Sequence, residues 1–272
     1  MDKMNELEEK CAALIDAVRE AGKRFLLPLL NKARSTTKAD GSLVTEADLA
    51  VNAFLCDRLR QRWPQVAVLS EETTGQAQLQ ALSHAGSGLW CIDPLDGTSN
   101  FSYGAPYFAV SVAYIVGHAL KAAVVYDPVR DEMFHAVSAG GAWCNGSRLE
   151  PAAVPDTPHE AIACIDFKRL PGTLGSSLLA KPGYSSQRNF GACALELCWL
   201  AAGRFHVYLH GGMKLWDYAA GALVLSEAGG MLSDLDGHSL TRVPDRLTTS
   251  VVAGTTPALY RQWYEYIAGA SS

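Results

Sequence analysis

Apolar residues return every three or four positions near the start of the chain, and this spacing predicts two amphipathic helices. The first spans residues 4–30 and ends near Pro28, because proline cannot continue the hydrogen-bond ladder. A polar loop over residues 35–42 separates it from the second helix, which begins at Thr45 and ends before Pro64. The chain therefore opens with two helices joined by a polar loop.

Further along, the apolar runs shorten to the length of strands, and turn residues separate them. Residues 66–69 predict a short buried strand, and residues 76–88 predict a polar, partly helical connection. Three β-rich runs follow at residues 108–116, 119–126 and 132–137. Because short turns separate them, they predict an antiparallel meander.

The second half alternates between the two periodicities, which predicts layers of helices and sheets. Strands are expected at residues 161–165, 205–209, 231–235 and 250–253, and helices at residues 193–202, 218–228 and 258–267. A weak boundary falls near residues 151–158. We therefore expect residues 1–272 to form one unit, with subdomains of approximately residues 1–150 and 151–272.

The strongest chemical signal is an apolar run that ends in two aspartates three residues apart, Asp93 and Asp96. Two carboxylates at the end of a buried strand are costly to desolvate unless a cation neutralises them. Hard oxygen ligands favour Mg²⁺, Mn²⁺ or Ca²⁺. Gly97 and Thr98 then offer backbone N–H groups to an anion beside that metal, which suggests phosphate chemistry. The alternative is a plain turn, since Pro94 and its neighbours are turn formers.

Further acids stand at a strand end or a helix start. Thr45 and Asp48 fit a helix capping box, in which side chain and backbone cap each other. Glu71 follows a predicted strand and, taken alone, is typical of a solvated loop. Asp217 is placed to cap the helix that follows it. Each residue alone leaves the structural and the functional interpretation open, but their coincidence favours a shared site.

The composition is that of a globular protein, with 272 residues of which 49% are hydrophobic and 19% charged. A formal net charge of −5 argues against stable binding to nucleic acid or to an anionic membrane. No apolar run is long enough to span a bilayer, and no secretory signal is visible. Seven scattered cysteines without a Cys-x-x-Cys pair predict reduced thiols and a cytoplasmic protein.

Two further pairs of residues have a spacing found in metal sites but lack the rest of a metal-binding motif. His206 and His210 have the i, i+4 spacing of a metal site, but they fall on a predicted strand and no His-Glu-x-x-His occurs. Asp234 and Asp236, followed by Gly237, lack the later ligands of an EF-hand loop. We expect no zinc at the histidines and a turn at the aspartates.

Four short motifs, in order along the chain, resemble those of the inositol monophosphatase family. Residues 93–101, D-P-L-D-G-T-S-N-F, resemble the family's D-P-[IL]-D-G-T-x-N-F. W-D-Y-A-A-G at residues 216–221 and E-A-G-G at residues 227–230 resemble its second signature. L-V-T-E-A-D at residues 43–48 and L-S-E-E at residues 69–72 are similar to the two remaining motifs. The resemblance extends over nearly the whole chain.

This resemblance implies an α/β protein with the layered αβαβα sugar-phosphatase fold. In that fold an antiparallel or mixed N-terminal sheet and a smaller C-terminal sheet lie between helices. It also implies Mg²⁺-dependent, commonly Li⁺-sensitive hydrolysis of phosphate monoesters by a homodimer. The implied ligands are Glu71, Asp93, the Leu95 carbonyl and the Thr98 hydroxyl for one Mg²⁺, and Asp93, Asp96 and Asp217 for a second.

The resemblance also assigns the remaining roles at the site. Glu71 would help to hold a third ion through water. Thr98 and Asp48 would orient the attacking water and accept its proton. The amides of Gly97 and Thr98 would hold phosphate oxygens. Gly191, Ala192 and Cys193 lie in a stretch that resembles the part of the family's pocket facing the alcohol.

The substrate is less sharply defined, because His210 stands where inositol phosphatases carry a glutamate. With Lys168, Arg169 and Arg188, His210 favours a more anionic leaving group. The expected substrate is inositol monophosphate or a related sugar, polyol or nucleotide phosphate. One alternative is a bisphosphate, such as adenosine 3′,5′-bisphosphate, fructose 1,6-bisphosphate or NADP. Another is a regulatory binding protein that retains the fold.

Overall fold

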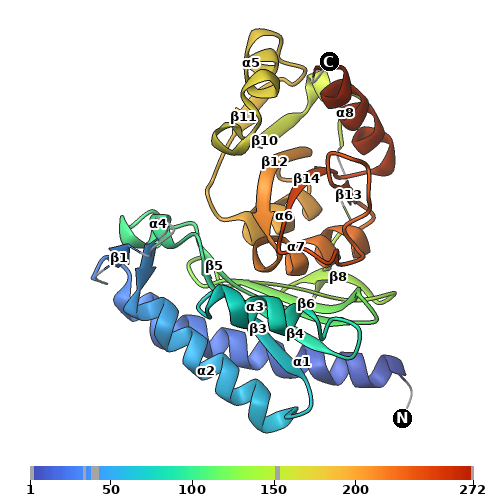
Figure 1. Ribbon diagram of the computed structural model, residues 1–272. Helices are drawn as coiled ribbons and strands as arrows, with labels where there is room; N and C mark the ends of the chain where they lie inside the picture. Colours follow the sequence, from blue (N-terminus) through green and yellow to red (C-terminus); the bar gives the residue numbers. More distant parts are fainter. Residues whose placement is uncertain (1–2, 33–34, 38–42, 151–153, 271–272) are drawn as a thin grey trace.

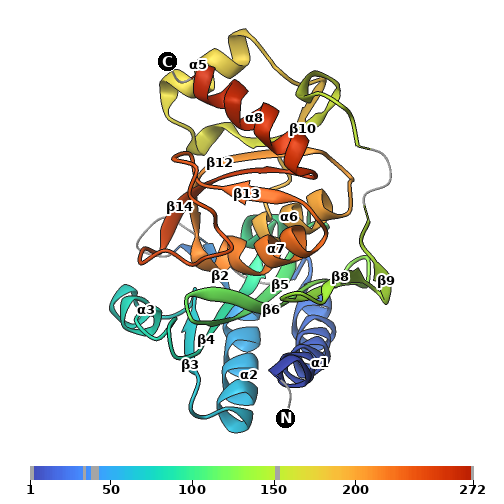
Figure 2. The same ribbon diagram turned by 90° about the vertical axis from the view of Figure 1, so that its right-hand side faces the viewer.

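The protein is built of five layers in the order helix, sheet, helix, sheet, helix, and both views show them (Figure 1, Figure 2). The computed structural model describes residues 3–32, 35–37, 43–150 and 154–270. The three helix layers are α1 (Lys3–Ala21) with α2 (Glu46–Arg62), α6 (Cys193–Ala201) with α7 (Leu215–Glu227), and α5 (Gly172–Ala180) with α8 (Pro257–Ala270). The predicted αβαβα fold is confirmed.

The larger sheet has seven strands in the order β3-β4-β5-β6-β7-β8-β9. Its strands are β3 (Ala67–Ser70), β4 (Leu89–Asp96), β5 (Ala109–Val116), β6 (Ala119–Asp127), β7 (Glu132–Val137), β8 (Gly141–Cys144) and β9 (Ser147–Arg148). Only the pair β3–β4 is parallel, so the sheet is mixed and the predicted meander is confirmed. A short helix, α3 (Gly75–Leu82), forms the partly helical connection between β3 and β4.

The smaller sheet has five strands in the order β11-β10-β12-β14-β13. Its strands are β10 (Ile162–Asp166), β11 (Ser186–Arg188), β12 (Val207–Lys214), β13 (Met231–Ser233) and β14 (Thr248–Gly254). β10 pairs in parallel with β11 and β12, and the remaining pairs are antiparallel. The sequence analysis missed α5 and β11, since neither has a long apolar period.

The N-terminal segment differs from the prediction of one helix over residues 4–30. α1 ends at Ala21, and the chain continues through a π-helical turn, Gly22–Leu26, and a 3-10 turn, Leu27–Leu29. A π turn adds a residue to the turn and so shifts the register of the side chains, which a simple helical period cannot show. Of the predicted polar loop, Ser35–Thr37 forms β1, which pairs with β2 (Leu43–Thr45). Residues 38–42 lie outside the described residues.

Apolar side chains fill the space on both sides of each sheet. One buried cluster lies under α1 and α2, one surrounds α6 and α7, and one lies under α5 and α8. All seven cysteines are free and five of them are buried, as expected of reduced core residues. None of the helices in the described part of the chain is long and apolar enough to cross a membrane.

Candidate metal and phosphate site

The site is built around the loop at the carboxyl end of β4. All eight residues of β4 are buried, and a helical turn, α4 (Thr98–Ser102), follows immediately. Gly97 joins the two with a φ of 90°, a conformation that favours glycine. A Cβ at Gly97 would also lie 3.0 Å from the Ala192 Cβ and 3.1 Å from the Tyr107 carbonyl oxygen. The turn therefore brings the end of β4 against the start of α6.

Asp48 is anchored at the start of α2 and reaches the same loop. The capping box is present as predicted: the Thr45 hydroxyl accepts from the Asp48 amide, and the Asp48 Oδ2 accepts from the Thr45 amide at 2.8 Å. The Thr98 hydroxyl lies 3.1 Å from the Asp48 Oδ1 and 3.0 Å from the Leu95 carbonyl oxygen. Burial raises the pKa of Asp48, while hydrogen bonds from Thr45 and Thr98 oppose the rise. Three predicted site residues, Asp48, Leu95 and Thr98, therefore meet at one point.

Asp93 and Asp96 end β4 with different surroundings. The Asp93 Oδ1 accepts a hydrogen bond from the Leu95 amide at 3.0 Å. Asp96 accepts from three amides at the start of α6: Cys193 at 2.9 Å, Ala194 at 2.8 Å and Leu195 at 3.2 Å. Burial and the nearby carboxylates hold the pKa of both aspartates well above the usual range.

Asp217 lies in the first turn of α7, but it is not the N-cap that the sequence predicted. The helix begins at Leu215, so Asp217 occupies the third helical position, and its Oδ2 accepts from the Lys214 amide at 2.9 Å. Burial, together with repulsion from Glu71, raises the pKa of Asp217 to about 7. The hydrogen bond from the Lys214 amide opposes this rise. The charge of Glu71 also acts on Asp48 and Asp93, so Glu71 belongs to the same electrostatic group.

The donor chemistry of this group fits a hard divalent cation, because every predicted ligand is an oxygen. No ion pair joins Asp93, Asp96 or Asp217 to a cationic side chain within the described ranges. Carboxylates that repel one another in a buried site are the setting in which such an ion lowers the free energy. Asp96 can bind an ion while it accepts from amides, since each carboxylate oxygen has two lone pairs.

Gly191, Ala192 and Cys193 lie directly before α6, beside Asp96 and Gly97. A residue that the sequence analysis did not select fixes this stretch: the Glu196 Oε1 accepts from the amides of Phe190 at 2.8 Å and Gly191 at 2.9 Å. Its Oε2 accepts from the Tyr208 hydroxyl at 2.9 Å, and Glu196 is 3% exposed. The signal was available, since Glu196 is the one charged residue in an otherwise apolar nine-residue helix.

His210 lies on β12, and its side chain contacts Asp166 rather than standing alone. The imidazole Nε2 is 3.3 Å from the Asp166 Oδ2, and Nδ1 accepts from the Gly212 amide at 3.1 Å. Of the predicted cations, Lys168 and Arg169 are exposed on the turn Phe167–Arg169 that follows β10. Arg188 instead donates to the Ser186 hydroxyl and the Gln187 carbonyl oxygen.

The predicted turn at Asp234 is confirmed, although its ligand atoms are close. Within the described part of the chain, Asp234, Asp236 and His238 are the one set of three acidic or histidine ligand atoms within 4.8 Å of one another. The Asp234 carboxylate is already bonded: it accepts from the amides of Asp236 and His238 and from the Arg246 guanidinium at 2.7 Å. The Arg246 guanidinium therefore balances the charge of the Asp234 carboxylate without a metal ion.

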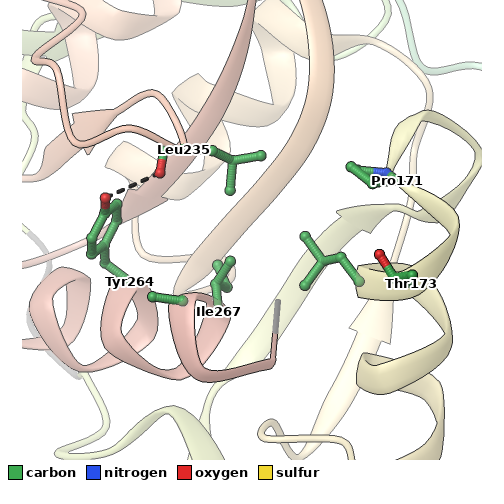
Figure 3. Close-up of a pocket in the computed structure, with 7 residues that line it drawn as sticks. Pro171, Thr173, Leu235, Tyr264 and Ile267 are labelled. Carbon is green, nitrogen blue, oxygen red and sulfur yellow. Dashed lines mark hydrogen bonds between the residues drawn. The ribbon is translucent and has the colours of Figure 1, made fainter. Parts of the chain in front are cut away.

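A separate cavity of about 330 Å³ lies between α5 and α8 (Figure 3). Pro171, Leu235 and Ile267 face it, and the Tyr264 hydroxyl at its edge donates to the Leu235 carbonyl oxygen at 3.0 Å. None of its lining residues carries a charge. It is therefore unsuited to a phosphate, and the acidic site at β4 remains the candidate for chemistry.

The five layers, with a mixed seven-stranded sheet and a five-stranded sheet, define an α/β protein of the layered inositol monophosphatase type. The model of the inositol monophosphatase family matches residues 6–272, and the chain belongs to that family. It is 34% identical to Nus factor SuhB of Salmonella typhimurium over 88% of this chain and 89% of that protein.

Relatives with different names match almost equally well. Inositol monophosphatase 1 of Solanum lycopersicum is 32% identical over 97% of both chains. The crystal structure of extragenic suppressor protein suhB from Bartonella henselae has a TM-score of 0.81 and 26% identity, covering 95% of this chain and 98% of that one. The chain is thus similar, at nearly equal identity, to family members that carry two different names.

Proposed function

We propose that the protein is a Mg²⁺-dependent phosphomonoesterase that hydrolyses inositol monophosphate or a related sugar or polyol phosphate. The observation that carries this proposal is the contact between Thr98 and Asp48 beside the Leu95 carbonyl and the buried carboxylates. Thr45 bonds to the same carboxylate as part of the capping box of α2, but Thr98 brings a second hydroxyl to it from the loop at β4, where capping does not require one. Membership of a family whose substrates are sugar phosphates supports the same conclusion.

The proposed ligands of Mg²⁺ are Glu71, Asp93, the Leu95 carbonyl, Thr98, Asp96 and Asp217. When bound, the metal supplies an acidified water and neutralises phosphate charge. Asp48 accepts the proton of the attacking water through Thr98, and burial, which raises the pKa of Asp48, makes it a better base than a solvated aspartate. The amides of Gly97 and Thr98 donate to phosphate oxygens, and residues 191–193 face the alcohol.

Two other functions have a specific observation in their favour. Lys168 and Arg169 are exposed on the turn after β10, which suits a bisphosphate substrate. The identity to Nus factor SuhB, 34%, is slightly higher than that to the inositol monophosphatase, 32%, so a Nus-factor role stands beside hydrolysis as a second candidate. That role would bring a macromolecular partner, and the two functions are compatible in one chain.

The test is phosphate release from a panel of inositol, sugar and nucleotide monophosphates and bisphosphates, with and without Mg²⁺. We expect Mg²⁺-dependent release that falls at least about a hundredfold in Asp93→Asn and Asp217→Asn, since loss of a charged partner in a buried site costs roughly 3–5 kcal/mol. Asp236→Asn, at an exposed acid away from the site, is the matched control. Release without Mg²⁺, or full activity in both site variants, would contradict the proposal.

A further inference from the structure

Alternation along two parallel strands places one carboxylate and one imidazole on the sheet face that is turned toward α6 and α7, the helices that bound the candidate site. Successive side chains of a strand face opposite sides of its sheet. Ile165 and Leu209 belong to the buried cluster under α5 and α8, so their neighbours Asp166 and His210 face the layer of α6 and α7. The register of β10 against β12 sets Asp166 directly beside His210.

The hydrogen bonds of His210 fix its role. Its Nδ1 accepts from the Gly212 amide, so the proton of the neutral ring is on Nε2, which faces the Asp166 Oδ2. The His210 side chain is 6% exposed, and both of its nitrogens are used within the protein. His210 is therefore placed to orient Asp166 and has no nitrogen left for a substrate.

Asp166 is the more accessible member of the pair, with 22% of its side chain exposed. Its Oδ1 accepts from the Lys168 amide at 3.0 Å, so each carboxylate oxygen has one partner within the chain and a second lone pair available. Burial alone would raise the pKa of Asp166, but the hydrogen bonds from His210 and the Lys168 amide, with the nearby charge of Arg169, outweigh it and lower the pKa. The group is an oriented, ionised acceptor.

The backbone holds this acceptor near Asp217. β12, which carries His210, ends at Lys214 and leads directly into α7, whose first turn carries Asp217. A Cβ at Gly211 would lie 1.9 Å from the Arg169 carbonyl oxygen, so only glycine lets that turn pack on the bulge of β12. The position of Asp166 is thus set by backbone packing as well as by His210.

We propose that Asp166 is a specificity-determining residue that accepts a hydrogen bond from a hydroxyl of the leaving group, and that His210 is its positioning residue. This inference rests on the proposed phosphatase function and deepens it. It selects alcohols that carry a further hydroxyl close to the ester, such as polyols and sugars, over alcohols that carry none. A site built to bind a hydroxyl discriminates against a substrate lacking it, because that substrate displaces water from the second lone pair of the acceptor without donating to it.

The experiment measures kcat/KM for inositol 1-phosphate and for p-nitrophenyl phosphate, which has no leaving-group hydroxyl. We expect Asp166→Ala, which removes the acceptor, to lower the ratio of the two values at least about tenfold, the loss that follows when a hydrogen bond to a charged group is removed. The loss is expected in kcat/KM for the polyol ester alone. His210→Ala should lower the ratio in the same direction, and His210→Gln, whose amide can still donate to Asp166, should retain most of it.

Asp236→Asn serves as the matched control, and thermal melting of every variant shows whether it folds. An unchanged ratio in a folded Asp166→Ala, or an equal loss with both substrates, overturns this inference and leaves the phosphatase proposal intact. A wild-type protein that releases no phosphate with Mg²⁺ from either ester overturns both. Equal ratios for His210→Gln and His210→Ala overturn the positioning role of His210.

Discussion

Truncation of Glu196 is expected to loosen the substrate side of the site and to destabilise the whole protein. Its carboxylate holds three donors: the Phe190 and Gly191 amides and the Tyr208 hydroxyl. Glu196→Ala leaves all three without their acceptor. Tyr208 is 1% exposed, so water cannot replace the acceptor of its hydroxyl and the loss there is about 1–3 kcal/mol.

The two amides lie nearer to solvent, and rehydration limits their loss to about 0.5–1 kcal/mol each. The sum is a destabilisation of about 2–5 kcal/mol. For a chain of this size it corresponds to a fall in Tm of roughly 4–20 °C. Glu196→Gln is the matched control, because its amide oxygen still accepts from Phe190 and Gly191 and its NH₂ group can donate to the Tyr208 oxygen. We expect that variant to lose less than about 1 kcal/mol.

Thermal melting and urea unfolding measure the stability of both variants, and kcat and KM measure the effect on the site. Because we propose that the stretch before α6 faces the alcohol of the substrate, Glu196→Ala should raise KM more than it lowers kcat, at a temperature where the protein is folded. The reasoning is refuted if Glu196→Ala stays within about 0.5 kcal/mol of the wild type. It is equally refuted if Glu196→Gln loses as much stability as Glu196→Ala.

Three further outcomes follow from single contacts. Gly97→Ala should lower the free energy of unfolding by at least about 1 kcal/mol and reduce activity, because φ at this position is 90° and a Cβ would meet Ala192 and Tyr107. A variant with the same Tm as the wild type would show that an alanine is not strained there. Hydrogen bonds from His238 and the charge of His238 outweigh burial and lower the pKa of Asp234. The stabilisation that ionised Asp234 contributes to the fold is therefore present above about pH 4 and is lost as pH falls through the lowered pKa. Asp234→Asn should therefore flatten the acid limb of a stability–pH curve, and an unchanged limb would contradict this. Mg²⁺ should raise the Tm of the wild type more than that of Asp93→Asn, and equal shifts in the two would speak against Asp93 as a ligand.

Most of the fold could be predicted from periodicity, because the core strands and helices are long and apolar. The meander at β5, β6 and β7 and the helices α2 and α6 lie within a few residues of their predicted bounds. The misses have local causes. α1 passes into a π turn that no period shows, and β12 extends beyond its apolar part because Gly211 and Gly212 form a bulge. β11 is three residues long and polar, so it depends on its partner β10.

The site was predictable where motif and local structure coincide, as at Asp48 with its capping box and at Gly97 with its positive φ. The partners made across the fold were not predictable. Glu196 is hidden in a helix, and the pairing of Asp166 with His210 depends on the register of two strands 44 residues apart. The sequence marks Glu196 as a charged residue in an apolar helix, but its partners are supplied by the tertiary structure.

The two aspartates at the end of β4 differ in how far the protein itself stabilises their negative charge. Asp96 accepts from three amides at the start of α6, where the helix dipole also favours a negative charge, so the protein itself offsets much of the cost of burying it. Among the residues that the structure describes, Asp93, 2% exposed, accepts from the Leu95 amide alone and faces repulsion from Glu71, Asp96 and Asp217. With hydrogen bonds to a charged group at roughly 1.5–3 kcal/mol each, Asp93 has about one third of the support of Asp96. Asp93 is thus the carboxylate that most needs a cation, while Asp96 ties the same loop to the helix that carries the substrate stretch. A metal held by both would therefore join the larger sheet to α6.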